Sequence, residues 1–275
     1  MLGADTVLRH FPHSAFIYEL MIAVENISKS FDGRQVLHNI SVEFLNGRTN
    51  LIIGQSGSGK TVLLNSIVGL HQPDSGHIYY DGRDITVMSK KERTMLRREI
   101  GMLFQGSALF DSMTLLENVM FPLDMFSDKS YKERKARAML CIDRVNLLGS
   151  EHKHPAELSG GMQKRAAIAR AIAMEPRYLF CDEPNSGLDP KTSLVIDKLI
   201  SEITHENNIT TIVNTHDMNS VIGIGENILF INNGTAAWQG NSKEVLTSNN
   251  KMLNDFVFAS EFSKQLRQDI LANIH

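Results

Sequence analysis

The chain has 275 residues, of which 42% are hydrophobic and 21% are charged, a composition usual for a globular protein with a sizeable core. The length suits one large α/β domain or two small ones. The formal net charge is −3 and both signs are spread along the chain, so non-specific nucleic-acid binding and adhesion to anionic lipid are disfavoured, and no nucleic-acid partner is expected.

The two cysteines, Cys141 and Cys181, are expected to be small core hydrophobes rather than a disulfide, which is typical of a reducing, cytoplasmic compartment. No apolar stretch reaches the roughly 18 uninterrupted residues of a membrane span. If the protein serves a membrane process, another chain must cross the bilayer.

Residues 1–20 are predicted to be a disordered extension or the product of a mis-assigned start. They lack the charged end, long apolar core and cleavage site of a signal peptide. Met21 opens an alternating, strand-like run, and we expect the folded domain to begin there.

Short apolar runs bounded by turn residues predict strands at Ile22–Ile27, Val36–Phe44, Asn50–Ile53 and His77–Tyr80. The third run leads into Gly54–Thr61, a complete match to G-x-x-x-x-G-K-[ST]. A helix is predicted over Thr61–Leu70, ending near Gly69. Strand, glycine loop and helix in this order are typical of a loop that binds the phosphates of a nucleoside triphosphate.

The backbone N–H groups of this loop are expected to turn inward around phosphate oxygens, with the positive end of the helix behind them. Lys60 should reach the β- and γ-phosphates, and the Thr61 hydroxyl should take a place on Mg²⁺. ATP and Mg²⁺ are therefore the expected ligands. The residues expected to bind the nucleotide here are Gly54, Gln55, Ser56, Gly57, Ser58, Gly59, Lys60, Thr61 and Val62.

After the loop, Lys90–Arg98 is predicted to be a charged helix and Ile100–Gln105 a short strand. The pattern then turns helical, with helices predicted over Leu115–Met125 and Tyr131–Val145. An inserted helical lobe over about 106–162 is therefore expected.

A second phosphate-binding segment, Leu158–Gln163, runs into an alanine-rich helix predicted over Met162–Met174. Ser159, Gly160 and Gly161 would present free N–H groups and the positive end of the helix dipole to an anion. Two such segments predict that the triphosphate is held from two sides and that the protein closes around it.

The unbroken apolar run Tyr178–Cys181 predicts a central parallel strand, buried on both faces, that ends at Asp182 and Glu183. Proteins of the α/β class bind ligands at this edge of the sheet. Asp182 fits a metal-linked carboxylate, and Glu183 fits the base that orients or deprotonates an attacking water. Because adjacent strand residues point to opposite faces, the two carboxylates can have different roles.

The last predicted elements are a helix over Lys191–Glu206, a strand over Ile209–Asn214, and a hairpin of Ile228–Ile231 with Thr235–Trp238. His216 follows its strand as Glu183 follows the central one, and it is the one histidine assigned to the site. Residues 244–275 are predicted to form a helical tail.

The segments that resemble the nucleotide-binding subunit of an ATP-binding-cassette (ABC) transporter are Gly54–Thr61, Gln105, Leu158–Gln163, Tyr178–Glu183, Ser186–Asp189 and His216. The Ser-Gly-Gly-Met-Gln signature is the specific element, because other P-loop enzymes lack it. The resemblance covers roughly residues 21–243, the expected nucleotide-binding domain. It implies an α/β fold: a P-loop NTPase (RecA-like) core with a mainly parallel sheet, an N-terminal antiparallel β subdomain and an inserted α-helical subdomain.

The resemblance also implies roles for single residues. Gln105 would ligate Mg²⁺ and join the metal site to the helical lobe and a transmembrane partner. Ser159, Gly160 and Gly161 would cap the γ-phosphate of ATP bound on the opposite subunit. Asp189 would lie at the dimer seam.

Two further residues, His216 and Phe31, receive roles from the same resemblance. His216 would contact the γ-phosphate and act in hydrolysis together with Lys60 and Glu183. Phe31, near the end of the first predicted strand, would either stack on adenine or simply pack.

As partners, the resemblance implies a homodimer around two ATP molecules, on the cytoplasmic face of the inner membrane. Transmembrane permease subunits would dock on the helical lobe. There the segments Phe104–Phe110 and Met113–Pro122, rich in Leu, Phe and Met, are lobe core, a docking groove or both. Residues 244–275 would contact the neighbouring ATPase or an accessory subunit.

The motifs that begin at Gly54, Phe104 and Cys181 resemble in sequence those of Mla-type (Mce-linked) ATPases, which serve phospholipid transport between bacterial inner and outer membranes. Asn185 departs from the threonine or tyrosine more usual there. An ABC ATPase for another substrate, such as an amino acid or a lipoprotein, is the alternative. A DNA-associated ABC ATPase would carry a long coiled-coil or zinc insertion, and the modest lobe here has neither. A non-hydrolysing module would be expected to lack Glu183 or His216, and both are present.

Overall fold

The computed structural model describes residues 21–259 together with residues 261, 264, 265, 267 and 269. The predicted N-terminal extension, residues 1–20, lies outside the described residues.

The N-terminal part of the chain forms a four-stranded antiparallel sheet with the order β2-β1-β4-β5. Its strands are β1 (Met21–Phe31), β2 (Arg34–Leu45), β4 (Ser75–Tyr80) and β5 (Arg83–Asp84). Alternating apolar residues such as Ile22 and Val24 are buried on one face of β1. The two-residue strand β5 was not predicted, because it is too short to show a period.

A six-stranded sheet with the order β10-β9-β3-β8-β7-β6 forms the centre of the molecule. Its strands are β3 (Thr49–Ile53), β6 (Ile100–Leu103), β7 (Tyr178–Asp182), β8 (Thr210–Thr215), β9 (Asn227–Asn232) and β10 (Thr235–Gly240). Strands β6, β7, β8, β3 and β9 run parallel, and β10 pairs antiparallel with β9 in the predicted hairpin. Every residue of β3, β7 and β8 is buried, as expected of strands covered on both faces.

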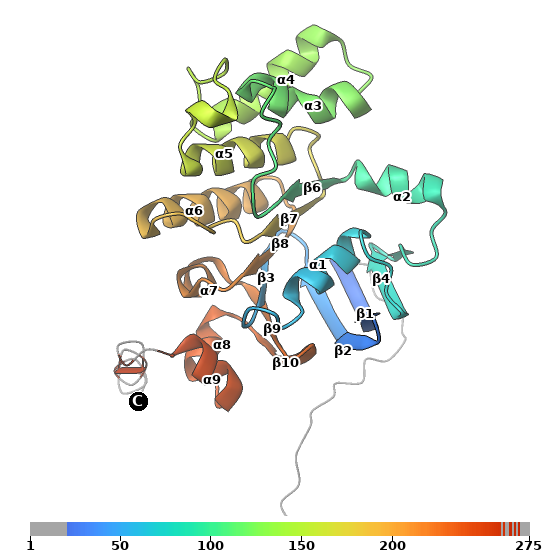
Figure 1. The fold of residues 1–275 in the computed structure, drawn as a ribbon, viewed down its shortest axis with the longest axis vertical. Helices are drawn as coiled ribbons and strands as arrows, with labels where there is room; N and C mark the ends of the chain where they lie inside the picture. Colours follow the sequence, from blue (N-terminus) through green and yellow to red (C-terminus); the bar gives the residue numbers. More distant parts are fainter. Residues whose placement is uncertain (1–20, 260, 262–263, 266, 268, 270–275) are drawn as a thin grey trace, which may run out of the picture.

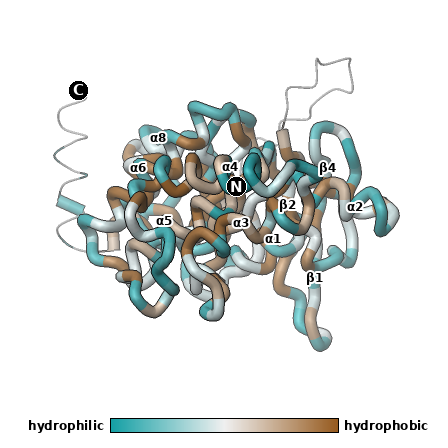
Figure 2. The backbone as a smooth tube through the Cα atoms, turned by 90° about the horizontal axis from the view of Figure 1, so that it is seen from above, coloured by the Kyte–Doolittle hydropathy of each residue, from teal (hydrophilic) through white to brown (hydrophobic). Residues whose placement is uncertain are grey.

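Helix α1 (Lys60–Val68) packs between the two sheets and ends at Gly69, which adopts a left-handed φ of 80°. Its apolar residues share one core with β1, β2, β4 and one face of the central sheet, and Figure 1 shows it beside β1 and β2. Helix α2 (Lys90–Arg97) buries only Leu96, and its tube in Figure 2 is largely teal, in keeping with its charged sequence.

Helices α5 (Gly160–Ala171), α6 (Pro190–Glu206) and α7 (Met218–Ile224) cover the other face of the central sheet and help to build a second core. Helices α3 (Leu115–Phe126) and α4 (Tyr131–Arg144) extend this core beyond α5, and a 3₁₀ turn at Pro155–Glu157 precedes α5. Helices α3, α4 and α5 pack on one another, and α5 also contacts β6 and α6. The helical lobe is thereby attached to the sheet through α5.

One predicted strand end needs correction, because the strand predicted to reach Gln105 ends at Leu103. Helix α7 was not predicted, because its seven residues give too short a pattern. The first part of the predicted helical tail contains two separate helices, α8 (Ser242–Thr247) and α9 (Lys251–Val257). Asn250 causes the break: its side chain accepts from Leu253 N and donates to Ala237 O.

Most of the tail beyond residue 259 lies outside the described residues. Within the described part of the chain, no helix has the length and apolar character needed to cross a membrane. The mainly parallel sheet, the antiparallel N-terminal sheet and the helical lobe together confirm the predicted α/β class.

Candidate active site

The glycine loop lies between β3 and α1, at the carboxyl edge of the central sheet, as predicted. Two of its glycines are required by close contacts and by positive φ angles. At Gly54, with φ 151°, a Cβ would lie 2.2 Å from the carbonyl oxygen of Ile231. At Gly59, with φ 106°, it would lie 2.9 Å from Leu37. The loop residues 55–57 are exposed, so their N–H groups are open to an anion.

Lys60 is held over this loop. Its Nζ donates to the carbonyl oxygens of Gly54 at 2.9 Å and Gln55 at 3.1 Å, and the residue is buried. Burial lowers the pKa of the Lys60 ammonium, while the charges of Glu183 and Asp182 oppose that shift. Both carboxylates of the predicted site therefore favour the charged form of Lys60.

Thr61 and Asp182 are joined by a side chain that was not predicted. Asn214 Nδ2 donates to Thr61 Oγ1 at 3.2 Å and to Asp182 Oδ1 at 2.5 Å. Burial raises the pKa of the Asp182 carboxyl, and the hydrogen bond from Asn214 opposes the shift. In the sequence, Asn214 could have been noticed only as the single amide in a strand that otherwise consists of threonine, isoleucine and valine.

Hydroxyl and carboxylate oxygens suit Mg²⁺, which proteins hold with one or two side chains plus substrate phosphates. The pairing of Thr61 with Asp182 fits that pattern. No cluster of three or more His, Cys, Asp or Glu side chains able to cage a metal occurs among the residues that the structure describes.

Glu183 and His216 meet at the same edge. His216 Nδ1 lies 2.8 Å from one Glu183 carboxylate oxygen and 2.9 Å from the other. The Glu183 side chain is 13% exposed and that of His216 is 65% exposed. The imidazole thus orients the carboxylate from the solvent side.

Asp182 and Glu183 were expected to diverge because adjacent residues of one strand point to opposite faces, and this reason is wrong. Strand β7 ends at Asp182, and Glu183 has a left-handed φ of 48° instead of continuing the strand. This backbone state costs a non-glycine residue roughly 1–2 kcal/mol. The turn, fixed by a bond from Glu183 N to Asn214 O at 2.9 Å, directs the carboxylate toward His216.

Gln105 is exposed just past β6, and a second unpredicted residue connects it to this edge. The buried Lys164 of α5 donates to the Gln105 carbonyl oxygen, and its Nζ lies 3.5 Å from the carbonyl oxygen of Glu183. Burial lowers the pKa of the Lys164 ammonium. Lys164 therefore links the helical lobe to the loop after β6 and to the loop after β7.

The signature segment forms the start of α5. Ser159 is its N-cap and accepts from Met162 N at 3.4 Å, and both Ser159 and Gly160 are exposed. Helix α5 packs on α3, α4, α6 and β6, whereas α1 packs on β2, β7 and β8. Within one chain the signature and the glycine loop thus lie in different parts of the molecule, as Figure 1 shows for α5 and α1.

Asp189 lies beside the signature of its own chain. It is the N-cap of α6 and accepts from Thr192 N at 3.0 Å. A Cβ on Gly161 would lie 2.6 Å from Thr192 Cγ2, so the absence of a side chain there lets α5 and α6 approach closely. Hydrogen bonds from Thr192 lower the pKa of the exposed Asp189 carboxyl.

Phe31 is the last residue of β1 and is 38% exposed. Its ring meets His71 edge-on at 5.3 Å, and Lys29 Nζ lies 5.3 Å from its centroid. Val62, in the first turn of α1, packs against the core between the two sheets. One part of the Phe31 ring is packed and another remains open.

A polar cluster that was not predicted lies behind Glu183. Asn185 Nδ2 donates to Asp197 Oδ1 at 2.8 Å and to Ser220 Oγ at 3.0 Å, and Ser220 Oγ donates to Asp197 Oδ2 at 2.8 Å. It links the loop after Glu183 to α6 and to α7, which follows His216.

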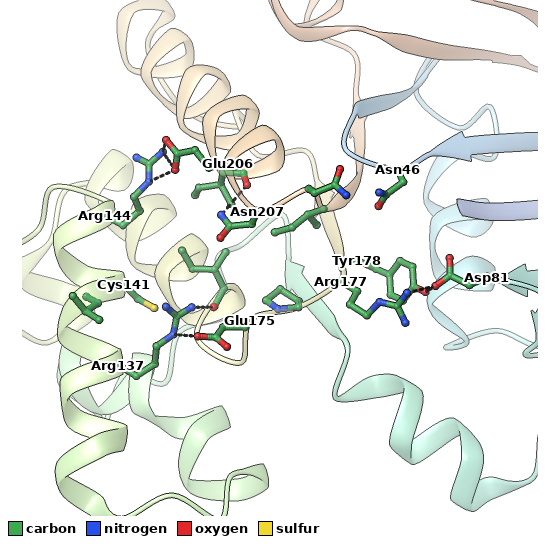
Figure 3. A pocket seen from close by; sticks show the side chains of 16 residues that line it. Asn46, Asp81, Arg137, Cys141, Arg144, Glu175, Arg177, Tyr178, Glu206 and Asn207 are labelled. Atoms are coloured by element: carbon green, nitrogen blue, oxygen red, sulfur yellow. Dashed lines mark hydrogen bonds and ion pairs between the residues drawn. The ribbon is translucent and has the colours of Figure 1, made fainter. Parts of the chain in front are cut away.

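Two cavities help to locate the site. One of about 450 Å³ is lined by Glu183, His216 and the loop before α6. Another, of about 600 Å³, lies at the opposite edge, where β7 and β8 begin (Figure 3). Its arginines are already paired: Arg137 with Glu175, Arg144 with Glu206 and Arg177 with Asp81. The carboxyl edge, with its open glycine loop, is the better place for a triphosphate.

Comparison with known proteins gives consistent results. A family model described as ABC transporter matches residues 37–186. The methionine import ATP-binding protein MetN of Carboxydothermus hydrogenoformans is 38% identical over 257 residues, covering 92% of this chain and 76% of that protein. The probable ribonucleotide transport ATP-binding protein mkl of Mycobacterium leprae is 36% identical over 236 residues, covering 86% and 68%.

Solved structures agree. The chain is similar to MJ0796, described as a bacterial ABC transporter cassette in a dimeric structure, with a TM-score of 0.74 and 34% identity over 81% of this chain and 99% of that one. A second MJ0796 structure is described as a post-hydrolysis state bound to ADP and Pi. CbiO1 of Clostridium perfringens aligns with a TM-score of 0.79 and 30% identity over 92% of this chain and 99% of that one.

Proposed function

The chain belongs to the ATPases of ABC transporters, and on that premise we propose that two copies close around two ATP molecules. Each ATP is bound between the glycine loop of one copy and the Ser159–Gly161 segment of the other. The observation that carries the proposal is the separation of these two anion-binding helix starts within one chain. A second copy supplies what a single chain cannot, and the dimeric cassette of MJ0796 is a related arrangement.

The proposed roles combine the positions of the side chains with the resemblance to the ABC ATPases. Lys60 binds the phosphates, and Thr61, Asp182 and Gln105 would hold Mg²⁺, which would supply positive charge to offset that of the triphosphate. Glu183 orients the attacking water and takes its proton, while His216 holds the Glu183 carboxylate and faces the γ-phosphate.

The remaining expected contacts lie at the margins of the site. Asp189 meets the partner copy at the seam, close to the contact between Thr192 and Gly161 of its own chain. Phe31 stacks on adenine with the open part of its ring.

We propose that a permease helix docks between β6 and the helical lobe. An apolar groove of about 420 Å³ lies there, lined in part by Phe104, Phe110, Phe121 and Met174. Phe110 and Phe121 pack on each other at 4.7 Å, yet Phe104 and Phe110 are each 41% exposed. Both earlier interpretations of this segment are compatible with that arrangement, since the rings form the lobe core and still leave an open apolar face.

For the cargo we propose phospholipid, moved between the inner and outer membranes of a bacterium with the ATPase on the cytoplasmic face of the inner membrane. The resemblance of the motifs at Gly54, Phe104 and Cys181 to those of Mla-type ATPases supports this proposal. The relatives named for methionine and ribonucleotide transport support import of another substrate as the alternative. Residues 244–275 are proposed to contact the neighbouring ATPase or an accessory subunit. Purification of the intact complex from native membranes, with identification of the permease and bound lipid, separates the two cargoes.

Glu183→Gln tests the ATPase proposal. The variant keeps the size of the side chain and removes the base, so ATP affinity should be retained while turnover falls by about 10²–10⁴-fold. Light scattering should show this variant as a dimer with ATP and a monomer with ADP. The double variant Glu183→Gln/Ser159→Arg should remain monomeric with ATP.

Lys60→Ala serves as the binding control, since it should lose nucleotide affinity. Hydrolysis by Glu183→Gln at a near-normal rate would exclude Glu183 as the base. A dimer that persists after Ser159→Arg would exclude the signature from the closed interface.

A further inference from the structure

Asn214 is the one side-chain amide in β8, and it is fully buried. Both of its N–H groups are used, one on Thr61 Oγ1 and one on Asp182 Oδ1. Its Oδ1 is buried and has no hydrogen-bond partner within the described part of the chain. A buried acceptor without a partner is unfavourable for folding, so an apolar residue would be the simpler choice for a strand covered on both faces.

The backbone fixes where this amide points. Asn214 pairs with Asp182 on β7 and with Ile52 on β3, just before the glycine loop. Its side chain therefore bridges the strand that carries Asp182 and the helix that begins after the loop. Its carbonyl oxygen also accepts from Glu183 N at 2.9 Å.

The hydrogen-bond chemistry leaves both oxygens able to bind a cation. A hydroxyl has one hydrogen and two lone pairs, so Thr61 Oγ1 can accept from Asn214 and keep a lone pair free. Asp182 gives one carboxylate oxygen to the amide and retains the other. The amide thus restrains two ligands that come from different elements and leaves each of them an electron pair for the cation.

We propose that Asn214 is a positioning residue that holds the Thr61 hydroxyl and the Asp182 carboxylate in place for a divalent cation and thereby sets the affinity of this ATPase for that ion. The inference rests on the proposed function, because that function assigns Thr61 and Asp182 to the metal. Asn214 itself does not ligate the ion. Its hydrogen bonds fix the two ligands before the cation binds, so that the ligands do not have to be ordered by the cation itself.

The test uses the full chain with ADP and Mn²⁺, whose binding is followed by electron paramagnetic resonance without turnover. Asn214→Val removes both donors at similar volume and should weaken Mn²⁺ binding by about tenfold or more, as expected for lost hydrogen bonds to a charged group. Asn214→Thr has the shape of valine but restores one donor, and its Mn²⁺ affinity should fall between those of the valine variant and the natural chain.

Thr211→Val is the matched control, because Thr211 is equally buried in β8 and bonded to Thr204 but lies at the other end of the strand. It should leave Mn²⁺ binding unchanged. Affinity for ADP in the presence of EDTA should be unchanged in the folded Asn214 variants, which a thermal melt identifies.

A folded Asn214→Val protein that binds Mn²⁺ as tightly as the natural chain would overturn the proposal. Equal Mn²⁺ affinities of the valine and threonine variants, both weakened, would also overturn it, since the donor would then be irrelevant. Failure of the proposed function looks different: the natural chain would not bind ADP with Mn²⁺, or Lys60→Ala would bind it undiminished.

Discussion

Asp197 is a carboxylate buried in the middle of α6, and it accepts hydrogen bonds from Asn185 and Ser220. Burial raises the pKa of the Asp197 carboxyl above its usual 3.8, although the hydrogen bonds from Ser220 and Asn185 oppose the shift. A raised pKa means that the folded chain holds this proton more tightly than the unfolded chain. The stability penalty is therefore absent below pH 3.8, grows as pH rises toward the folded pKa, and is complete above it.

Asp197→Asn keeps the size of the side chain and removes the charge. Its free energy of unfolding, taken relative to the natural chain, should therefore rise as the pH increases above 3.8 and level off once the pH exceeds the folded pKa. Urea denaturation over this range measures the difference, and Asp128→Asn at an exposed position is the control. A difference that stays constant with pH would show that Asp197 does not carry the penalty.

The chemistry-bearing residues were largely predictable, and the residues that hold them were not. Lys60, Thr61 and Glu183 lie in motifs whose spacing is local in sequence. Asn214 contacts Thr61 across 153 positions, and Lys164 reaches Gln105 across 59, so no local pattern reveals these contacts. Only the strand register and the packing of α5 bring them together.

At the scale of elements, the contact between α5 and α6 depends on a glycine. Thr192 Oγ1 is bonded to Asp189, which restricts rotation of the threonine, and its methyl carbon lies 2.6 Å from the position of a Cβ on Gly161. Gly161→Ala should therefore destabilise the fold by about 1–3 kcal/mol, the usual cost of overpacking. Urea denaturation provides the measurement.

Gly160→Ala is the matched control, because its Cβ would meet Leu188 at an ordinary 3.6 Å. That variant should be neutral or slightly stabilising, since alanine suits a helix better than glycine. Thr192→Ser keeps the hydroxyl and removes the methyl, so it should rescue Gly161→Ala. Equal stability of the two alanine variants would contradict the packing argument.

Long periodic elements and motif-linked elements were predictable, whereas short or interrupted ones were not. Helix α1 ends at Gly69 and the hairpin of β9 and β10 forms as expected, because glycine and turn residues mark both. Helix α7 has seven residues, and the break before α9 depends on a bond from Asn250 to Ala237. That bond joins the tail to β10, a tertiary contact that sequence periodicity does not encode.

At the scale of the whole molecule, one chain holds half of each proposed reaction centre. The glycine loop, Asp182 and Glu183 lie at the sheet edge, while Ser159 is exposed at the start of α5 in the helical lobe. The lobe that would receive the permease is therefore the part that presents the signature to the partner copy. Lys164 connects that lobe to the Glu183 carbonyl oxygen, with 3.5 Å between the two atoms.

The most direct test mixes two inactive variants, Lys60→Ala and Ser159→Arg, and measures ATP hydrolysis. Each should be nearly inactive alone, because every site in either homodimer lacks one side. A mixed dimer contains one intact site, so activity of the mixture should rise above that of either variant, up to about a quarter of that of the natural chain, the limit reached if copies pair at random. A mixture no more active than its parts, or full activity of Ser159→Arg alone, would contradict a reaction centre shared between two copies.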